Sequence, residues 1–121
     1  MARIMGVETF FTEDVALVRV RTEDGHEGWG QAAPYHADIT ALVLHRQVAP
    51  HVLGHDDDDL TALGERVMER EHKFPGSHLV RALGGVDTAL WDLRGKRTGR
   101  PVRLPRRSHS AVSTPPSART R

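Results

Sequence analysis

The sequence predicts an α+β fold, in which a three-stranded antiparallel meander is followed by three helices. Segments of strand-like composition all fall within residues 2–33, and segments with helical periodicity come later. Strands and helices that do not alternate along a chain indicate α+β rather than a parallel α/β sheet. Only 5% of the 121 residues are aromatic, so we expect a modest, aliphatic core.

The expected strands are Ile4–Phe11, Val15–Thr22 and Glu27–Ala33. In the second strand, alternate apolar residues predict one buried face, formed by Ala16, Val18 and Val20. Asp24-Gly25 is a strong hairpin signal between the second and third strands. The first connection, near Thr12-Glu13-Asp14, is also short, so the three strands are predicted to pair in sequence order.

Two helices are expected next. Asp38 is predicted to cap the first, which Pro50 ends or kinks. The acidic run Asp56–Asp59 precedes the second helix. Its position is explained by helix capping and by the favourable interaction of aspartates with the helix macrodipole. The residues expected to face inward from the second helix are Leu60, Leu63, Val67 and Met68.

The third helix is predicted from Ser77, as N-cap, to a stop signal at Gly99 and Pro101. Its apolar residues keep a 4-3-4-3 spacing on one face: Leu79, Leu83, Val86, Leu90 and Leu93. Gly84 and Gly85 each cost about 1 kcal/mol relative to alanine in a helix interior. We therefore expect this glycine pair to allow close approach of another backbone.

The composition changes abruptly after Val102, so the expected domain is residues 1–102. Residues 103–121 contain five arginines, four serines, three prolines and no acidic residue, and are expected to be a disordered tail. The remaining residues hold 12 basic and 16 acidic side chains. An acidic body argues against nucleic-acid binding by the fold itself, so any such binding is expected from the tail alone.

Several classes of protein are not favoured. The chain has no cysteine, no apolar run long enough to span a membrane, and no apolar leader, so a cytoplasmic protein is expected. Glycine-rich nucleotide-binding loops, an HExxH zinc motif and a serine nucleophile elbow are absent from the sequence.

The order A-x-G-G-V-D-x-A-L-W-D-L at Ala82–Leu93 resembles the helical signature of the mandelate racemase/muconate-lactonising group of the enolase superfamily. The segments DGHEGWGQAA (Asp24–Ala33) and PHVLGHD (Pro50–Asp56) resemble it too. The resemblance implies that this chain is the N-terminal capping domain of such an enzyme. In that domain Gly84, Gly85, Asp87, Trp91 and Asp92 would form the structural signature of the helix leading to a catalytic (β/α)₈ barrel.

The resemblance also implies two substrate-specificity loops, which cover the mouth of the barrel in intact members. One is Phe10–Asp14, with Thr12 and Glu13; the other is residues 34–37, with Tyr35 and His36. A phenol and an imidazole can both donate hydrogen bonds to a carboxylate substrate. The competing interpretation places Tyr35 against the sheet edge and leaves His36 solvated.

The family's chemistry is abstraction of the proton α to a carboxylate, which gives an enediolate held by Mg²⁺. The ligands and bases sit on the barrel, so this chain is expected to bind no cofactor and to have no catalytic residue. Lys73 and Lys96 are its only lysines, and both are predicted at helix ends. We expect a truncated acid-sugar dehydratase or racemase, with a frameshift near Val102 as one cause, that is inactive alone. Whether the chain counts as an enzyme stays open.

Other groups have mainly structural interpretations. His51 and His55 with the acidic run could form a cation site, but Pro50 and Gly54 disrupt the helix that would align them. Asp87 and Asp92 are five residues apart and point differently, whereas Asp92 and Lys96 form an ordinary i,i+4 pair. Trp29 and Trp91 are expected to be core or interface anchors.

Two alternative functions remain open at this stage. The first is a non-enzymatic interaction module, in which exposed apolar surface drives homo-oligomerisation or association with a barrel supplied by another chain. The second is weak binding of anionic polymers through the arginine tail, which would be sensitive to salt.

Overall fold

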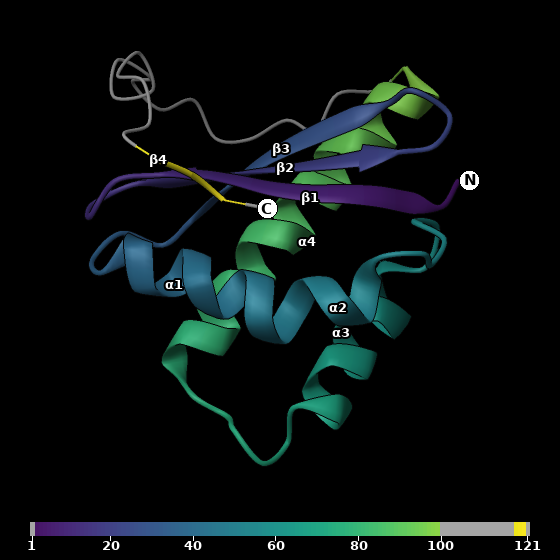
Figure 1. Ribbon diagram of the computed structural model, residues 1–121. Helices are drawn as coiled ribbons and strands as arrows, with labels where there is room; N and C mark the ends of the chain where they lie inside the picture. The colour runs from purple at the N-terminus through teal and green to yellow at the C-terminus, as the bar shows by residue number, and fades with distance from the viewer. Residues whose placement is uncertain (1, 100–117, 121) are drawn as a thin grey trace.

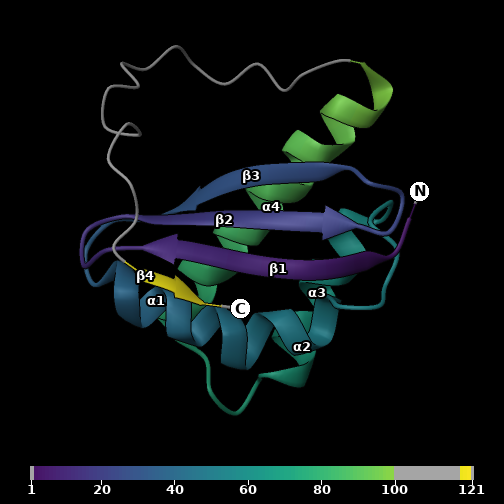
Figure 2. The same cartoon turned by 45° about the horizontal axis from the view of Figure 1, so that its top comes forward.

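The computed structural model describes residues 2–99 and 118–120, and it has two layers (Figures 1 and 2). The sheet contains β1 (Ile4–Phe11), β2 (Ala16–Thr22), β3 (Glu27–Ala32) and the short β4 (Ala118–Thr120), in the order β3-β2-β1-β4 with all neighbours antiparallel. The first three strands form the predicted meander. The expected tail, residues 103–121, otherwise lies outside the described residues.

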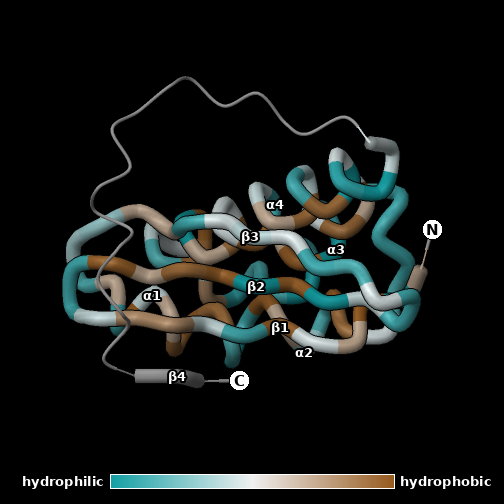
Figure 3. The backbone as a smooth tube through the Cα atoms, turned by 90° about the horizontal axis from the view of Figure 1, so that it is seen from above, coloured by the Kyte–Doolittle hydropathy of each residue, from teal (hydrophilic) through white to brown (hydrophobic). Residues whose placement is uncertain are grey.

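The helices cover one face of this sheet. They are α1 (Ala37–Val43), the π-helical turn η1 (Leu44–Val48), α2 (Ala49–Val52), α3 (Leu60–Arg70) and α4 (Ser77–Thr98). α1, η1 and α2 form one continuous run, so the three predicted helices are confirmed. Viewed from above the sheet, α4 runs beneath β3 (Figure 3). None of the described helices is long and apolar enough to cross a membrane.

The core lies between the sheet and the helices. The buried face of β2 is confirmed, because Ala16, Val18 and Val20 are all at most 1% exposed. From α4, Leu79, Val86, Leu90 and Leu93 are buried against it, and Leu83 packs at the margin. The core is aliphatic, as the composition predicted.

Some local predictions are wrong. The first helix begins at Ala37 with the backbone of His36 as its N-cap, so Asp38 lies inside the first turn. Of the two alternatives for Pro50, ending the helix is wrong, because the helix continues to Val52; the irregularity that was the other alternative takes the form of a π turn at Leu44–Val48, directly before α2. Met68 is 41% exposed, since the inward face of α3 is filled by its leucines and Val67. Gly76, not Ser77, occupies the N-cap of α4.

Other end signals are correct. The Asp59 carboxylate accepts a hydrogen bond of 3.0 Å from the Ala62 N–H and so caps α3. Gly99 adopts the left-handed conformation that ends α4, with φ of 73°. The hairpin glycine, Gly25, likewise has a positive φ of 86°. These positions matter because they set the lengths of the strands and of the helix that carries the signature.

Candidate functional site

The two predicted specificity loops lie side by side at one end of the sheet. The β1–β2 turn and the β3–α1 loop are at the same end in both ribbon views (Figures 1 and 2). The Ala37 N–H donates a 2.9 Å hydrogen bond to the Glu13 carbonyl oxygen. This bond joins the loops directly, so residues about two dozen positions apart form one continuous edge.

The first loop is a tight turn held by its own threonine. The Thr12 N–H donates to the Val15 carbonyl oxygen at 2.8 Å, while the Thr12 hydroxyl accepts from the N–H groups of Asp14 and Val15 at 3.2 and 3.1 Å. Thr12 is therefore engaged locally, as hydroxyls often are in turns. The Glu13 side chain remains exposed beside it.

The second loop presents its two ring side chains to solvent. Tyr35 is 73% exposed and His36 is also exposed, and neither side chain forms a hydrogen bond or ion pair with the described residues. Both backbones are left-handed, with φ of 68° and 52°. Two consecutive non-glycine residues in this region store strain of about 1–3 kcal/mol each. The interpretation that Tyr35 packs on the sheet edge is wrong.

The expected close approach of two backbones occurs, but it depends mainly on glycines in β3 and less on the glycine pair in α4. A Cβ on Gly28 would overlap the Ala89 carbonyl oxygen, and one on Gly30 would overlap the Gly85 carbonyl oxygen. Gly85 itself lies against β2 and β3, where an added Cβ would be 3.1 Å from Val18 Cγ2. The sequence analysis missed Gly28 and Gly30, although their spacing of two places both on one face of the strand.

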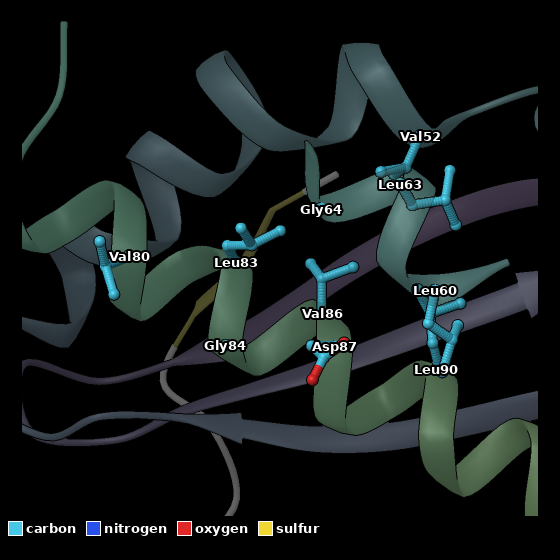
Figure 4. A pocket seen from close by; sticks show the side chains of 10 residues that line it. All are labelled: Val52, Leu60, Leu63, Gly64, Val80, Leu83, Gly84, Val86, Asp87 and Leu90. Carbon is cyan, nitrogen blue, oxygen red and sulfur yellow. The ribbon is translucent and has the colours of Figure 1, made fainter. Parts of the chain in front are cut away.

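For Gly84 the expectation of close approach is wrong. Apart from its chain neighbours and its own helix backbone, no atom of the described residues lies within 4 Å of the position that its Cβ would occupy. Gly84 instead lines a groove between α3 and α4 with a volume of about 260 Å³, shown with its other lining residues in Figure 4. The glycine pair therefore has two different surroundings, one packed and one open.

The two signature aspartates also differ in their surroundings. The Asp92 carboxylate accepts a 2.8 Å hydrogen bond from the Trp29 N–H of β3 and lies 3.0 Å from Lys96 Nζ, so it joins the helix to the sheet. Asp87 lies at the groove, and burial there raises the pKa of its carboxyl. It forms no hydrogen bond or ion pair with the described residues. From the sequence, only the different directions of the two side chains could be predicted, not this difference in their surroundings.

The tryptophans lie on opposite sides of the domain. Trp29 is half-buried on the outer face of the sheet, 5.6 Å from the Phe10 ring, and the Arg19 guanidinium stacks over it at 5.5 Å. Trp91 is 47% exposed on α4. The Arg94 guanidinium lies over its ring, 5.6 Å from the ring centroid. Trp91 is thus not part of the domain's own core.

An ionic cluster fixes the end of α4. Arg97 pairs with the buried Asp57 and, at 3.1 Å, with Asp24 in the β2–β3 turn. The Thr22 hydroxyl and then Arg97 hold the pKa of the Asp24 carboxyl well below its usual range. Asp57 also accepts from the Ala2 N–H at 3.2 Å. These bonds tie the first residues, the hairpin and the helix end together.

The residues considered for cation binding are used elsewhere. His51 lies 2.8 Å from Glu71, and the His51 and Gln47 hydrogen bonds lower the pKa of the Glu71 carboxyl. Within residues 2–99 and 118–120, no three or more histidine, aspartate or glutamate side chains group as metal ligands. No magnesium site is therefore assigned to the described residues.

Comparisons with known proteins place these features in a family. Residues 2–104 match the family described as mandelate racemase/muconate lactonizing enzyme, N-terminal domain. The chain is 33% identical to a D-galactonate dehydratase family member from Paenibacillus sp. (strain JDR-2), over 84% of this chain and 26% of the relative. The chain thus spans about a quarter of the length of the curated relatives it matches.

Solved structures agree with this assignment. A candidate racemase from Roseobacter denitrificans is 61% identical with a TM-score of 0.78, over 80% of this chain and 26% of that one. A mandelate racemase/muconate lactonizing protein from Paracoccus denitrificans PD1222, complexed with magnesium, is 35% identical with a TM-score of 0.75, over 82% and 28%. Both likenesses therefore involve only about a quarter of a longer chain.

Proposed function

The chain belongs to the mandelate racemase/muconate lactonizing enzyme family as its N-terminal domain, and we propose that it is the substrate-capping domain of an acid-sugar dehydratase or racemase. The observation that carries this proposal is the joined pair of loops at one end of the sheet. Their contact through Glu13 and Ala37 gives a single edge on which the side chains of Tyr35 and His36 are exposed and have no hydrogen-bond partner among the described residues.

The proposed chemistry is removal of the proton α to a carboxylate, in an active site completed by a barrel domain. Magnesium, when bound by barrel residues, stabilises the charge that develops on the carboxylate. No ligand for it is assigned to the described residues of this chain. Acid sugars are proposed as the substrate class because relatives include proteins named D-galactonate dehydratase and arabinonate dehydratase.

The proposed role of this chain is to bind and orient the end of the substrate that faces away from the metal. The Tyr35 hydroxyl can donate or accept a hydrogen bond with a sugar hydroxyl, and the His36 imidazole can do the same. Their strained backbones keep both rings out of the domain's own surface, so they are available to a ligand. The turn at Thr12 fixes the position of Glu13 beside them.

The proposal can be tested in a chimaera. The matching residues of the Roseobacter denitrificans protein are replaced by residues 2–99 of this chain, and turnover of a panel of acid sugars is measured. Tyr35→Phe and His36→Gln should each raise KM about tenfold, with a smaller change in kcat, since a hydrogen bond to a polar ligand contributes about 1–1.5 kcal/mol. Thr61→Ala, an exposed change on α3, is the matched control. If the two loop variants behave like the control on every substrate turned over, the proposal fails.

A further inference from the structure

A small apolar cluster lies beneath the two joined loops, apart from the main core of the domain. It consists of Ala16, Ala32 and Ala37, which are at most 3% exposed, and of Phe11, which is half-buried against them. The core between the sheet and the helices is formed by other residues. Among the described members of this loop cluster, Phe11 is the one whose side chain is larger than a methyl group.

Strand register brings these residues together at the loop end of the sheet. Phe11 pairs with Ala16, and Ala16 pairs with Ala32 of the next strand. Directly paired residues of antiparallel strands project to the same face, and Ala16 belongs to the buried face of β2. The three side chains therefore form a row on the face covered by helices, where Ala37 joins them from the first turn of α1.

The loop cluster holds both ends of the loop that carries Tyr35 and His36. Ala32 is the last residue of β3 before this loop, and Ala37 is the first residue of α1 after it. The left-handed backbones of Tyr35 and His36 lie between these two anchors. Strained backbone persists only where the surrounding structure fixes it. Since both anchors pack in one cluster with Phe11, the conformation of the loop depends on that ring.

Phe11 also leads directly into the other loop. It is the last residue of β1, and Thr12 follows it at the start of the tight turn. The Ala37 N–H, which donates to the Glu13 carbonyl oxygen at 2.9 Å, belongs to a fully buried residue of the loop cluster. A hydrogen bond that is shielded from water is stronger than one in water. The ring thus supports the bond that joins the two loops.

We propose that Phe11 is a positioning residue for substrate binding, which fixes the spacing between the turn at Glu13 and the rings of Tyr35 and His36. The inference rests on the proposed function, since the spacing matters only if both loops face a substrate. Phe11 lies on the helix-covered face, so it acts through the loops and not by touching the ligand. A fixed spacing allows the loop pair to distinguish acid sugars that differ in the configuration of one hydroxyl, because misplaced binding groups lose much of their effect.

The preceding residue provides a matched comparison. Phe10 carries the same ring and is also half-buried, but it lies on the opposite face of β1. Its ring centroid is 5.6 Å from that of Trp29 and 5.3 Å from the guanidinium carbon of Arg19. It is not part of the loop cluster. Removing each ring in turn therefore separates an effect on the loops from a general loss of stability.

The first measurement is amide hydrogen exchange in the full chain, followed by NMR. In Phe11→Ala, the Ala37 amide should exchange about tenfold faster relative to the Val86 amide of the main core, because its shielding ring is lost. Phe10→Ala should leave this ratio unchanged. Phe11→Leu should restore most of the protection, and it provides the test by itself if the alanine variant does not fold.

The second measurement is turnover by the chimaera with the Roseobacter denitrificans protein. Phe11→Ala should raise KM about tenfold for the acid sugar that is turned over best, with a change in kcat below about threefold. The preference in kcat/KM for that sugar over its epimer should fall about tenfold, and Phe11→Leu should recover most of both losses. A role in folding alone would reduce the amount of active enzyme and leave KM and the preference unchanged. Thr61→Ala is again the control.

The outcomes separate this inference from the proposed function. An equal exchange ratio in Phe11→Ala and Phe10→Ala would overturn the positioning role. Faster exchange at Ala37 with unchanged KM and preference would overturn it too, and the proposed function would stand if Tyr35→Phe and His36→Gln still raise KM. Unchanged KM in the variants of all three residues would reject the proposed function and the positioning role together.

Discussion

Helix α4 meets its surroundings in two contrasting ways. On the side of the sheet, glycines in β3 let the helix backbone approach so closely that no side chain fits between them. On the side of α3, glycines leave a groove of about 260 Å³ that nothing in the described chain fills. The sheet side of α4 is closely packed within the domain, whereas the side facing α3 is open.

Glycines at neighbouring positions of one helix can therefore have opposite surroundings, one closely packed and the other open. Gly85 is buried against the sheet, and its neighbour Gly84 is exposed. Consecutive helical positions differ by about 100°, so the pair necessarily faces two directions. The aspartates repeat the pattern, because Asp92 accepts a hydrogen bond from β3, whereas Asp87 has no hydrogen-bond partner among the described residues. Substitutions on the two sides should therefore differ in sign as well as in size.

The largest effect is expected from filling the packed side. Gly28→Ala and Gly30→Ala should each lower the free energy of unfolding by about 3 kcal/mol, because the new Cβ overlaps backbone atoms of α4 that cannot rotate away. Urea unfolding of the purified chain measures this. Gly84→Ala is the control. A loss below about 1 kcal/mol at both strand positions would show that the helix and strand are not in close contact.

A smaller loss is expected from Asp92→Ala. The Trp29 N–H would lose its acceptor and Lys96 its partner, which costs about 1–3 kcal/mol for a partly buried donor. Asp87→Ala is the matched control, since it removes the same group from the same helix and breaks no hydrogen bond within the described chain. Equal losses for the two variants in chemical denaturation would contradict the contrast between the two sides.

The open side should respond in the other direction. Gly84→Ala and Gly64→Ala should each raise the free energy of unfolding of the chain alone by about 0.5–1 kcal/mol, because alanine favours the helix and the space is free. Gly85→Ala should gain nothing, since its Cβ would press on Val18 at 3.1 Å. Thermal melts of the three variants under one set of conditions decide the matter. Destabilisation by Gly84→Ala would mean that the groove is filled in the chain alone.

The sequence predicted most of the fold because its signals are local. β1 has the predicted bounds, while β2 and β3 differ from theirs by one residue at one end. Asp59 and Gly99 act through their nearest neighbours, so their roles could be predicted from the chain order. The prediction for Asp38 is wrong because the β3–α1 loop, which is bonded to Glu13, starts the helix two residues earlier than a cap at Asp38 would.

The candidate site was less accessible to sequence reasoning. The loops that contain Glu13 and Ala37 are in contact. This contact depends on how the three strands fold back on one another, which no local sequence signal encodes. The resemblance pointed to Gly84 and Asp87 as part of a structural signature, but the glycine pair was expected to allow close approach of another backbone at both positions. Whether that face is packed or open depends on where α3 lies, and only the tertiary arrangement shows it.

The subtlest difference between the two sides concerns pH. Burial raises the pKa of the Asp87 carboxyl in the folded chain above its unfolded value of about 4. Between these two pKa values the folded state binds more protons, so the stability linked to Asp87 is present at lower pH and is lost as pH rises through the folded pKa. Asp87→Asn should therefore raise the urea midpoint at pH 7 relative to the unmodified chain by more than it does at pH 4.

A second aspartate supplies the opposite sign as a control. The pKa of Asp24 is lowered in the folded chain, so its stabilising contribution is present above the unfolded pKa and is lost as the solution becomes more acidic. Asp24→Asn should flatten the acid limb of the same titration. The two substitutions should therefore change the pH dependence of stability in opposite directions. Changes of the same sign at both positions would contradict the opposite pKa shifts of the two carboxyls.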